Sequence, residues 1–194
     1  MKYKSILLTE QVYKELNALR ESLSKKASKA VTFSETIEEL AGRKAILLSL
    51  NQDLVDYITK FVALLEKRRG VKGVVLFGSV AKGTATKYSD IDLFIIVEEK
   101  LGDYQDYAHT AIMSLNERRQ DLVQKGVFNY LSPTIASIED LNEFKPLYLD
   151  IVDYGIVLYD PEGMVEGFMK KMKAIPHRRE QTIYGEVLKW RTKG

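Results

Sequence analysis

Residues 74–97 have the sequence VVLFGSVAKGTATKYSDIDLFIIV, which is the most informative part of the chain. It contains two apolar runs, residues 73–77 and 91–97, with the β-branched and aromatic composition typical of buried strands. The loop between them opens with Gly78-Ser79, where glycine allows a sharp turn and a close approach of the backbone to a ligand. The pattern therefore predicts two strands joined by a loop that can bind a ligand.

Two aspartates, Asp90 and Asp92, close the loop. Side chains two apart on a strand point to one face, so the two carboxylates lie side by side and repel each other. A hard cation such as Mg²⁺ relieves that repulsion, and proteins typically bind Mg²⁺ through one or two carboxylates together with substrate phosphates. A lone Gly-Ser is commonly a turn, and a lone Asp-x-Asp is commonly a solvated strand end. Their conjunction, with ten residues between them and an apolar strand on each side, favours a phosphate and metal site.

This combination resembles the nucleotidyltransferases of the DNA polymerase β superfamily, particularly the small minimal type, whose motif is G-S-x-A-R-G followed by S-D-x-D. The residues that match are Gly78, Ser79, Ala81, Gly83, Ser89, Asp90 and Asp92. Lys82 stands where the family has arginine, which keeps the charge and loses the planar fork. The resemblance spans about residues 52–160 and implies an α/β fold of the α+β type, with a mixed sheet flanked by helices.

The resemblance also implies a reaction. A nucleoside monophosphate would pass from a nucleoside triphosphate, with ATP expected, to a hydroxyl group of a protein or small molecule, and pyrophosphate would leave. Asp90 and Asp92 would be the catalytic residues and would bind Mg²⁺ or Mn²⁺. The residues implied to bind the nucleotide are Gly78, Ser79, Lys82, Lys87 and Ser89.

One carboxylate of the family pattern is missing. The family has a third carboxylate on a later strand, whereas residues 127–135 of this chain contain no acidic residue. Glu139 lies just beyond and is the candidate for this third carboxylate, although an acid there also favours the start of a helix. Two functions therefore stay open. The chain is an active nucleotidyltransferase, or it is a DNA-binding regulator or antitoxin that binds nucleotide and a protein partner with weak or no turnover.

Residues 1–48 are expected to form a separate strand–helix–helix extension, and residues 1–45 resemble the ribbon-helix-helix-like N-termini of antitoxins. A short strand needs a partner, so pairing with its twin predicts a homodimer, and a two-stranded ribbon fits the DNA major groove. The alternative is that the two helices only pack on the catalytic domain. Members of the nucleotidyltransferase family often act as antitoxins, so a toxin-like protein is a candidate partner. The residues expected to contact DNA are Lys2, Lys4, Ser5, Thr32 and Ser34.

Residues 49–160 are expected to form the nucleotidyltransferase domain. Apolar periodicity predicts helices over residues 51–69 and 103–124, and a strand over 127–135 that contains Pro133. A helical region is expected within residues 140–154, before a strand at 155–159. Residues 161–194 are expected to form a basic helical tail packed on this domain, with Trp190 as a packing residue of its helix.

The charges of the chain are unevenly distributed. The total is 29 Lys+Arg against 27 Asp+Glu, a net charge of +2. The balance is +3 over residues 1–50, −6 over residues 51–162 and +5 over residues 163–194. The near-neutral total therefore does not argue against a nucleic-acid partner.

The chain contains no cysteine, which excludes disulfides, thiolate metal sites and thiol catalysis and fits a reducing compartment. It also has no apolar run of the roughly 20 residues that a membrane span requires. These features predict a cytoplasmic protein without a membrane partner.

Overall fold

The computed structural model describes residues 52–99, 102–182 and 185–191, together with scattered positions between residues 10 and 36. The chain divides into two compact units, Met1–Leu48 and Ser49–Gly194. In the first unit, every described position between residues 10 and 24 is helical, and the ring of Tyr13 stacks on Phe33 at a centroid distance of 5.5 Å.

Most of the N-terminal predictions fall outside the described residues. These are the strand expected over residues 2–8 and four of the five candidate DNA contacts, namely Lys2, Lys4, Ser5 and Ser34. Thr32 is described, and its carbonyl oxygen accepts a hydrogen bond from the Thr36 N–H at 3.0 Å.

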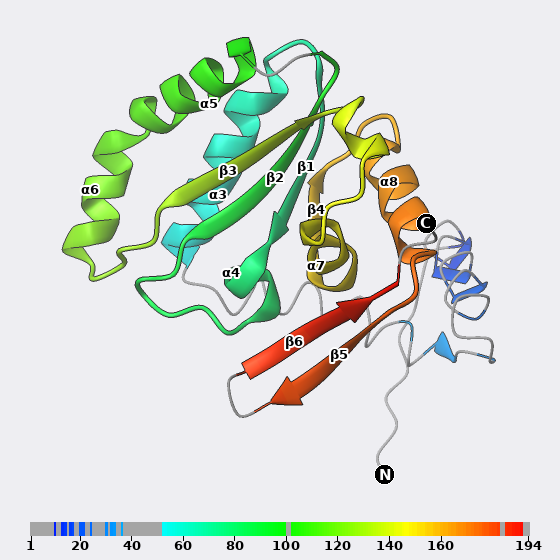
Figure 1. The fold of residues 1–194 in the computed structure, drawn as a ribbon. Coiled ribbons are helices and arrows are strands. Elements are labelled where there is room, and N and C mark those ends of the chain that lie inside the picture. Colours follow the sequence, from blue (N-terminus) through cyan, green and yellow to red (C-terminus); the bar gives the residue numbers. More distant parts are fainter. Residues whose placement is uncertain are drawn as a thin grey trace. The chain divides into compact units, whose positions relative to one another are not determined.

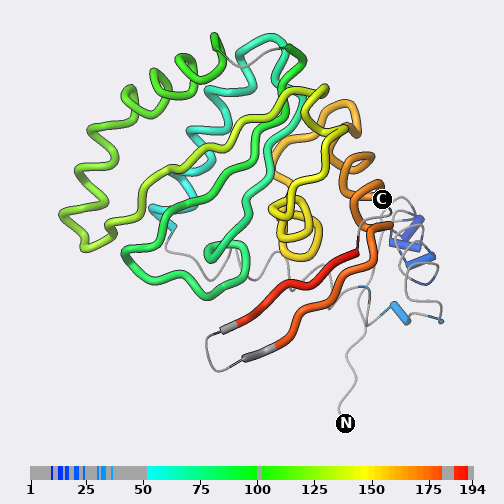
Figure 2. The backbone as a smooth tube through the Cα atoms, viewed as in Figure 1, coloured from blue at the N-terminus to red at the C-terminus, as the bar shows by residue number. Residues whose placement is uncertain are grey.

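A mixed four-stranded sheet forms the centre of the second unit (Figure 1). Its strands are β1 (Val71–Phe77), β2 (Ile91–Val97), β3 (Leu131–Ser137) and β4 (Ile156–Tyr159). The strand order is β3-β2-β1-β4, with β1 antiparallel to both β2 and β4 and with β2 parallel to β3. The short helix α4 (Gly78–Lys82) begins directly after β1 and leads into the loop before β2 (Figure 2).

Helices cover both faces of the sheet (Figure 1). They are α3 (Gln52–Glu66), α5 (Gly102–Ser114), α6 (Asn116–Gln124), α7 (Leu147–Tyr154) and α8 (Met164–Lys173), with a 3-10 turn η1 at Asp140–Asn142. α7 and α8 lie on one face, and α3 and α5 lie on the other. The α/β fold with a mixed sheet flanked by helices is therefore confirmed.

The face of the sheet that α7 and α8 cover consists of alternate residues of the strands. Phe94 of β2 packs against Tyr148 of α7 and Phe168 of α8, with ring centroids 5.7 Å from each. Phe94, Tyr148 and Phe168 are all buried. Because side chains alternate along a strand, Asp92 projects from the same face of β2 as Phe94, toward α7.

Two predicted elements of the sheet domain differ from the structure. The helix expected over residues 103–124 is two helices with a break at Leu115, where no glycine or proline marks it. The strand expected over residues 127–135 is β3 at Leu131–Ser137. Pro133 is tolerated because β3 is an edge strand, where a missing N–H donor leaves no ladder bond unmade.

The C-terminal tail is helical only as far as α8. Beyond it, β5 (His177–Thr182) and β6 (Gly185–Trp190) form an antiparallel hairpin, so the helix predicted to contain Trp190 is wrong. Charged side chains occupy both faces of this hairpin, and the sequence therefore lacks the apolar alternation that would have predicted strands. Within the described residues, no helix is both long and apolar enough to cross a membrane.

Candidate active site

The turn from β1 into α4 brings Gly78 beneath the Asp92 carboxylate. Phe77, the last residue of β1, is paired in register with Asp92 on the neighbouring strand. Gly78 has φ +70°, in the left-handed region, and a Cβ built on it would collide with the Asp92 carboxylate. Glycine is therefore required here for two reasons, its backbone conformation and the close approach of Asp92.

The two predicted carboxylates lie together at the start of β2. Asp90 is exposed and Asp92 is partly buried. Burial raises the pKa of the Asp92 carboxyl, the negative charges of Asp90 and Asp150 raise it further, and the Lys82 ammonium opposes them. The pKa of Asp92 is therefore raised mainly by burial and in addition by two neighbouring negative charges, which a bound cation would offset.

α4 presents Ser79 next to this pair. The Ser79 carbonyl accepts the Thr84 N–H at 3.0 Å, while no described residue hydrogen-bonds its hydroxyl. Gly83, at φ +72°, ends the helix, and its N–H points back to the Val80 carbonyl at 3.1 Å. The Ser79 hydroxyl is therefore available to a ligand.

The loop before Asp90 is held by its own hydrogen bonds. Buried Asn129 donates its side-chain N–H groups to the carbonyls of Thr86 at 3.0 Å and Ser89 at 2.6 Å. The Ser89 hydroxyl accepts the Thr86 N–H at 2.9 Å. Ser89, predicted to bind the nucleotide, thus has its hydroxyl engaged within the loop.

The two candidate lysines also have protein partners. The Lys82 ammonium lies 2.8 Å from the Asp150 carboxylate and 4.7 Å from the centre of the Tyr154 ring. The Lys87 ammonium lies 5.0 Å from the centre of the Tyr88 ring. Lys82 acts on the charge of Asp92 and would have to be shared between Asp150 and a triphosphate, whereas Lys87 lies on the loop before Asp90.

The structure does not bring Glu139 to the pair. β2 and β3 run parallel, and the residue in register with Asp92 is Ser132. Glu139 follows Ser137, which is in register with Val97 at the opposite end of β2. No group of three or more histidine, cysteine or acidic side chains within the described residues is arranged to hold a metal ion. The acidic residue that does approach Asp92 is Asp150, on α7.

Asp150 belongs to a charged cluster that joins α7 to the hairpin. Arg179 of β5 contacts Asp150 at 3.1 Å, Asp153 at 2.6 Å and Glu186 at 2.8 Å. His177 contacts Asp153 at 2.9 Å. Asp150 and Asp153 lie within the helical region expected over residues 140–154, but nothing in the sequence indicated that Arg179, more than 25 residues away, would pair with them.

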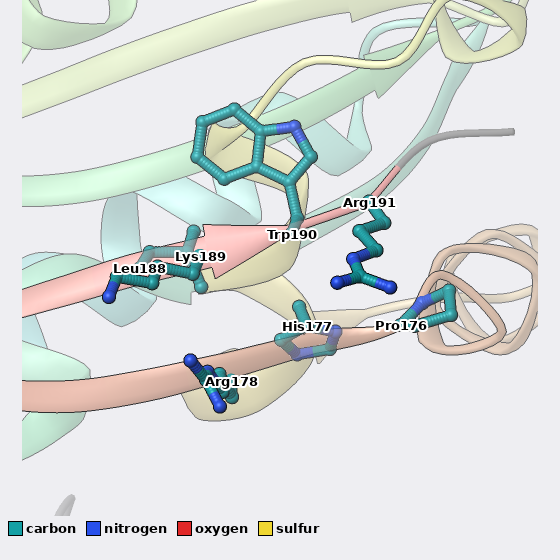
Figure 3. A pocket seen from close by; sticks show the side chains of 7 residues that line it. All are labelled: Pro176, His177, Arg178, Leu188, Lys189, Trp190 and Arg191. Carbon is teal, nitrogen blue, oxygen red and sulfur yellow. The ribbon is translucent and has the colours of Figure 1, made fainter. Parts of the chain in front are cut away.

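A separate open concavity of about 720 Å³ lies along the hairpin (Figure 3). It is lined by Pro176, His177, Arg178, Leu188, Lys189, Trp190 and Arg191. Trp190 also packs against Phe144, with ring centroids 6.1 Å apart. The surface is basic, and none of the residues predicted to bind nucleotide or metal lines it.

Comparison with known proteins extends these observations. Residues 58–183 match the family described as "Nucleotidyltransferase domain". A relative from Methanocaldococcus jannaschii, named "Putative protein adenylyltransferase MJ1305", is 27% identical over 123 residues, which cover 61% of this chain and 78% of that protein.

Two solved structures match this chain at low identity and low TM-score. One is a toxin–antitoxin with AMP-PNP, at 19% identity and a TM-score of 0.40, covering 64% of this chain and 86% of that one. The other is a mutant of the toxin–antitoxin MntA-HpeT, at 21% identity and a TM-score of 0.38, covering 65% and 85%. The family match alone spans well over half of the 194 residues, and this chain therefore belongs to the nucleotidyltransferase domain family.

Proposed function

We propose that this protein transfers an adenylyl group from ATP to a hydroxyl group of a protein acceptor. Membership of the nucleotidyltransferase family supports the transfer of a nucleotide. The name of the Methanocaldococcus relative supports the adenylyl group and the protein acceptor. The observation that carries the proposal is that the Asp92 carboxylate lies against Gly78, with Asp90 beside it. The two halves of the motif are therefore close together in the fold.

In the proposed reaction, the acceptor oxygen attacks the α-phosphorus of ATP and forms a phosphodiester bond. The bond from that phosphorus to the oxygen bridging to the β-phosphate breaks, and the electron pair leaves with pyrophosphate. The hydroxyl proton passes to water. The Ser79 hydroxyl donates a hydrogen bond to the departing phosphates, and Lys82 offsets part of their charge.

Asp90 and Asp92 fit a divalent cation such as Mg²⁺ or Mn²⁺. Both supply the oxygen ligands that Mg²⁺ prefers, and Asp90 and Asp150 place negative charge beside the partly buried Asp92 carboxylate. The missing side chain at Gly78 leaves the room that the Asp92 carboxylate occupies. When bound, the ion would supply positive charge to the triphosphate, while the β1–β2 register fixes the direction of the carboxylate.

The test uses ATP labelled at the α-phosphorus, incubated with the protein, Mg²⁺ and cell extract as a source of acceptors. Asp90→Asn and Asp92→Asn remove charge with little change of shape, and we expect each to reduce labelling about 100-fold or more. Asp103→Asn, at an exposed carboxylate in the first turn of α5, is the matched control.

Equal labelling from γ-labelled ATP would contradict the proposal, because that label leaves with pyrophosphate in nucleotidyl transfer. Full labelling by both aspartate variants would contradict it as well.

A second candidate is a regulator that binds nucleotide with weak or no turnover. It is favoured by the absence of a carboxylate on β3 in register with Asp92. Binding of the non-hydrolysable analogue AMP-PNP, combined with no transfer of α-label to any acceptor, supports this candidate over the first.

The wider biological role is proposed from the sequence alone. The likeness of residues 1–45 to antitoxins supports a role beside a toxin-like protein partner, with a homodimer and DNA contacts formed through the extension. DNA affinity that falls steeply with salt would support the contacts, since each lysine–phosphate contact releases counterions.

A further inference from the structure

A group of aromatic and cationic side chains, some of them exposed, lies on the loop that leads to Asp90, on the segment before β3 and on α6. We name it the aromatic–cationic surface, and its residues are Lys87, Tyr88, Arg119, Phe128 and Tyr130. Tyr88 is 68% exposed and stacks on Phe128 with ring centroids 5.5 Å apart. Tyr130 is 56% exposed, and the Arg119 guanidinium lies 3.5 Å from the centre of its ring.

The backbone carrying these rings is fixed. The Phe128 N–H donates to the Lys87 carbonyl at 3.0 Å, and the Ile91 N–H donates to the Tyr130 carbonyl at 2.6 Å. Buried Asn129, between the two aromatic residues, ties the segment to the loop before Asp90. Large aromatic side chains held rigidly in water are typical anchors of protein interfaces, because they lose little conformational freedom on binding.

The surface lies on the acceptor side of the proposed reaction. β2 lies between β1 and β3 in the sheet. Ser79 and Lys82 follow β1, whereas Phe128 and Tyr130 precede β3. In an in-line displacement the attacking and leaving oxygens are on opposite sides of the phosphorus. If pyrophosphate departs over Ser79 and Lys82, the acceptor hydroxyl approaches from the β3 side.

The charge of the surface indicates what it binds. Lys87 and Arg119 form no ion pair with any residue that the structure describes. Both cations instead lie over aromatic rings, with Lys87 also 5.8 Å from the centre of Phe128. The Lys87 ammonium and the partly buried Arg119 guanidinium form no ion pair among the described residues and lie next to exposed tyrosines. Such a surface complements a partner that carries carboxylates and apolar or aromatic groups.

We propose that the aromatic–cationic surface binds the acceptor, an acidic protein segment, and presents its hydroxyl group to Asp90 and Asp92. This proposal rests on the proposed function, which requires a protein acceptor. It adds where that acceptor docks and what composition it has.

The test measures binding of the full-length protein to fluorescein-labelled poly(Glu,Tyr), an acidic copolymer with tyrosine hydroxyls, by fluorescence anisotropy without ATP. We expect Tyr88→Ala to weaken binding about tenfold, the scale of losing an aromatic anchor, and Tyr88→Phe to retain it. Lys87→Glu is expected to weaken binding further, and basic poly(Lys,Tyr) is expected not to bind. The matched controls are Val157→Ala on β4, at the opposite edge of the sheet, and Lys170→Glu on α8.

Several results would overturn the proposal. Equal affinity of wild type and Tyr88→Ala for poly(Glu,Tyr) would do so, as would equal losses in the two control variants. Weaker binding of AMP-PNP by Tyr88→Ala, with copolymer binding unchanged, would assign the ring to the nucleotide base instead. The anisotropy measurement does not require nucleotidyl transfer. Failure of the α-label experiment would therefore contradict the proposed function, and the anisotropy result could still be interpreted independently.

Discussion

Gly78 combines two constraints that can be separated by substitution. Alanine at φ +70° costs roughly 1–2 kcal/mol in backbone strain, and its Cβ would also push the Asp92 carboxylate away. Gly163 has nearly the same φ, +71°, with open space around it, so Gly163→Ala carries the backbone cost alone. In urea unfolding we expect both variants to lose about 1 kcal/mol or more of stability, and only Gly78→Ala to lose transfer of the α-label. Equal transfer by the two variants would show that the collision with Asp92 is harmless.

Residue spacing indicated Gly78, Asp90 and Asp92 as neighbours because the motif lies on one strand–loop–strand unit, where sequence distance and spatial distance agree. It did not indicate that Asn129 ties the loop together, because that contact spans 40 residues or more. The sequence did not predict the ion pair between Lys82 and Asp150 for the same reason. Contacts of this kind depend on how helices and strands pack together, and the local pattern of residues in the sequence gives no information about that packing.

At the scale of elements, the same reasoning explains which boundaries were predictable. β2 has the bounds expected from its apolar run, and α3 lies within the helix expected over residues 51–69. The hairpin of β5 and β6 was missed because its inner face pairs with acids of α7 instead of filling an apolar core. A strand that is stabilised by ion pairs lacks the alternation of apolar and polar residues from which strands are predicted.

His177 makes the docking of this hairpin sensitive to pH. Burial lowers the pKa of His177, but hydrogen bonds to the Ile175 carbonyl and the Asp153 carboxylate outweigh it, so the pKa is raised above its usual 6.5. Both ring nitrogens face acceptors, at 2.7 and 2.9 Å, which only the charged imidazolium satisfies fully. The stability it adds is therefore fully present below pH 6.5 and is lost as the pH rises through the folded-state pKa.

We expect His177→Gln to cost about 1.5 kcal/mol in urea unfolding at pH 5.5, the lower end of the scale of a hydrogen bond to a charged group, and much less at pH 8.5. His109→Gln, at an exposed position on α5, should cost little at either pH. A cost for His177→Gln that does not change with pH would contradict the charged state assigned to this residue.

In the second unit as a whole, segments of opposite net charge contact each other. The acidic segment 51–162 and the basic segment 163–194 contact each other where α7 packs against the hairpin. Arg179 lies at the centre of this contact, and its side chain is only 16% exposed.

Removing Arg179 leaves Asp150 and Asp153 without this partner, so Arg179→Ala should loosen the hairpin and leave the sheet intact. We expect amide exchange in residues 177–182 and 185–190 to accelerate about tenfold, while β1 and β2 stay protected; 1 M NaCl should act in the same direction by screening. Arg178→Ala is the matched control, since that neighbouring side chain is 73% exposed and pairs with Glu180. Equal acceleration by both variants would mean that strand pairing, and not the charged cluster, holds the hairpin in place.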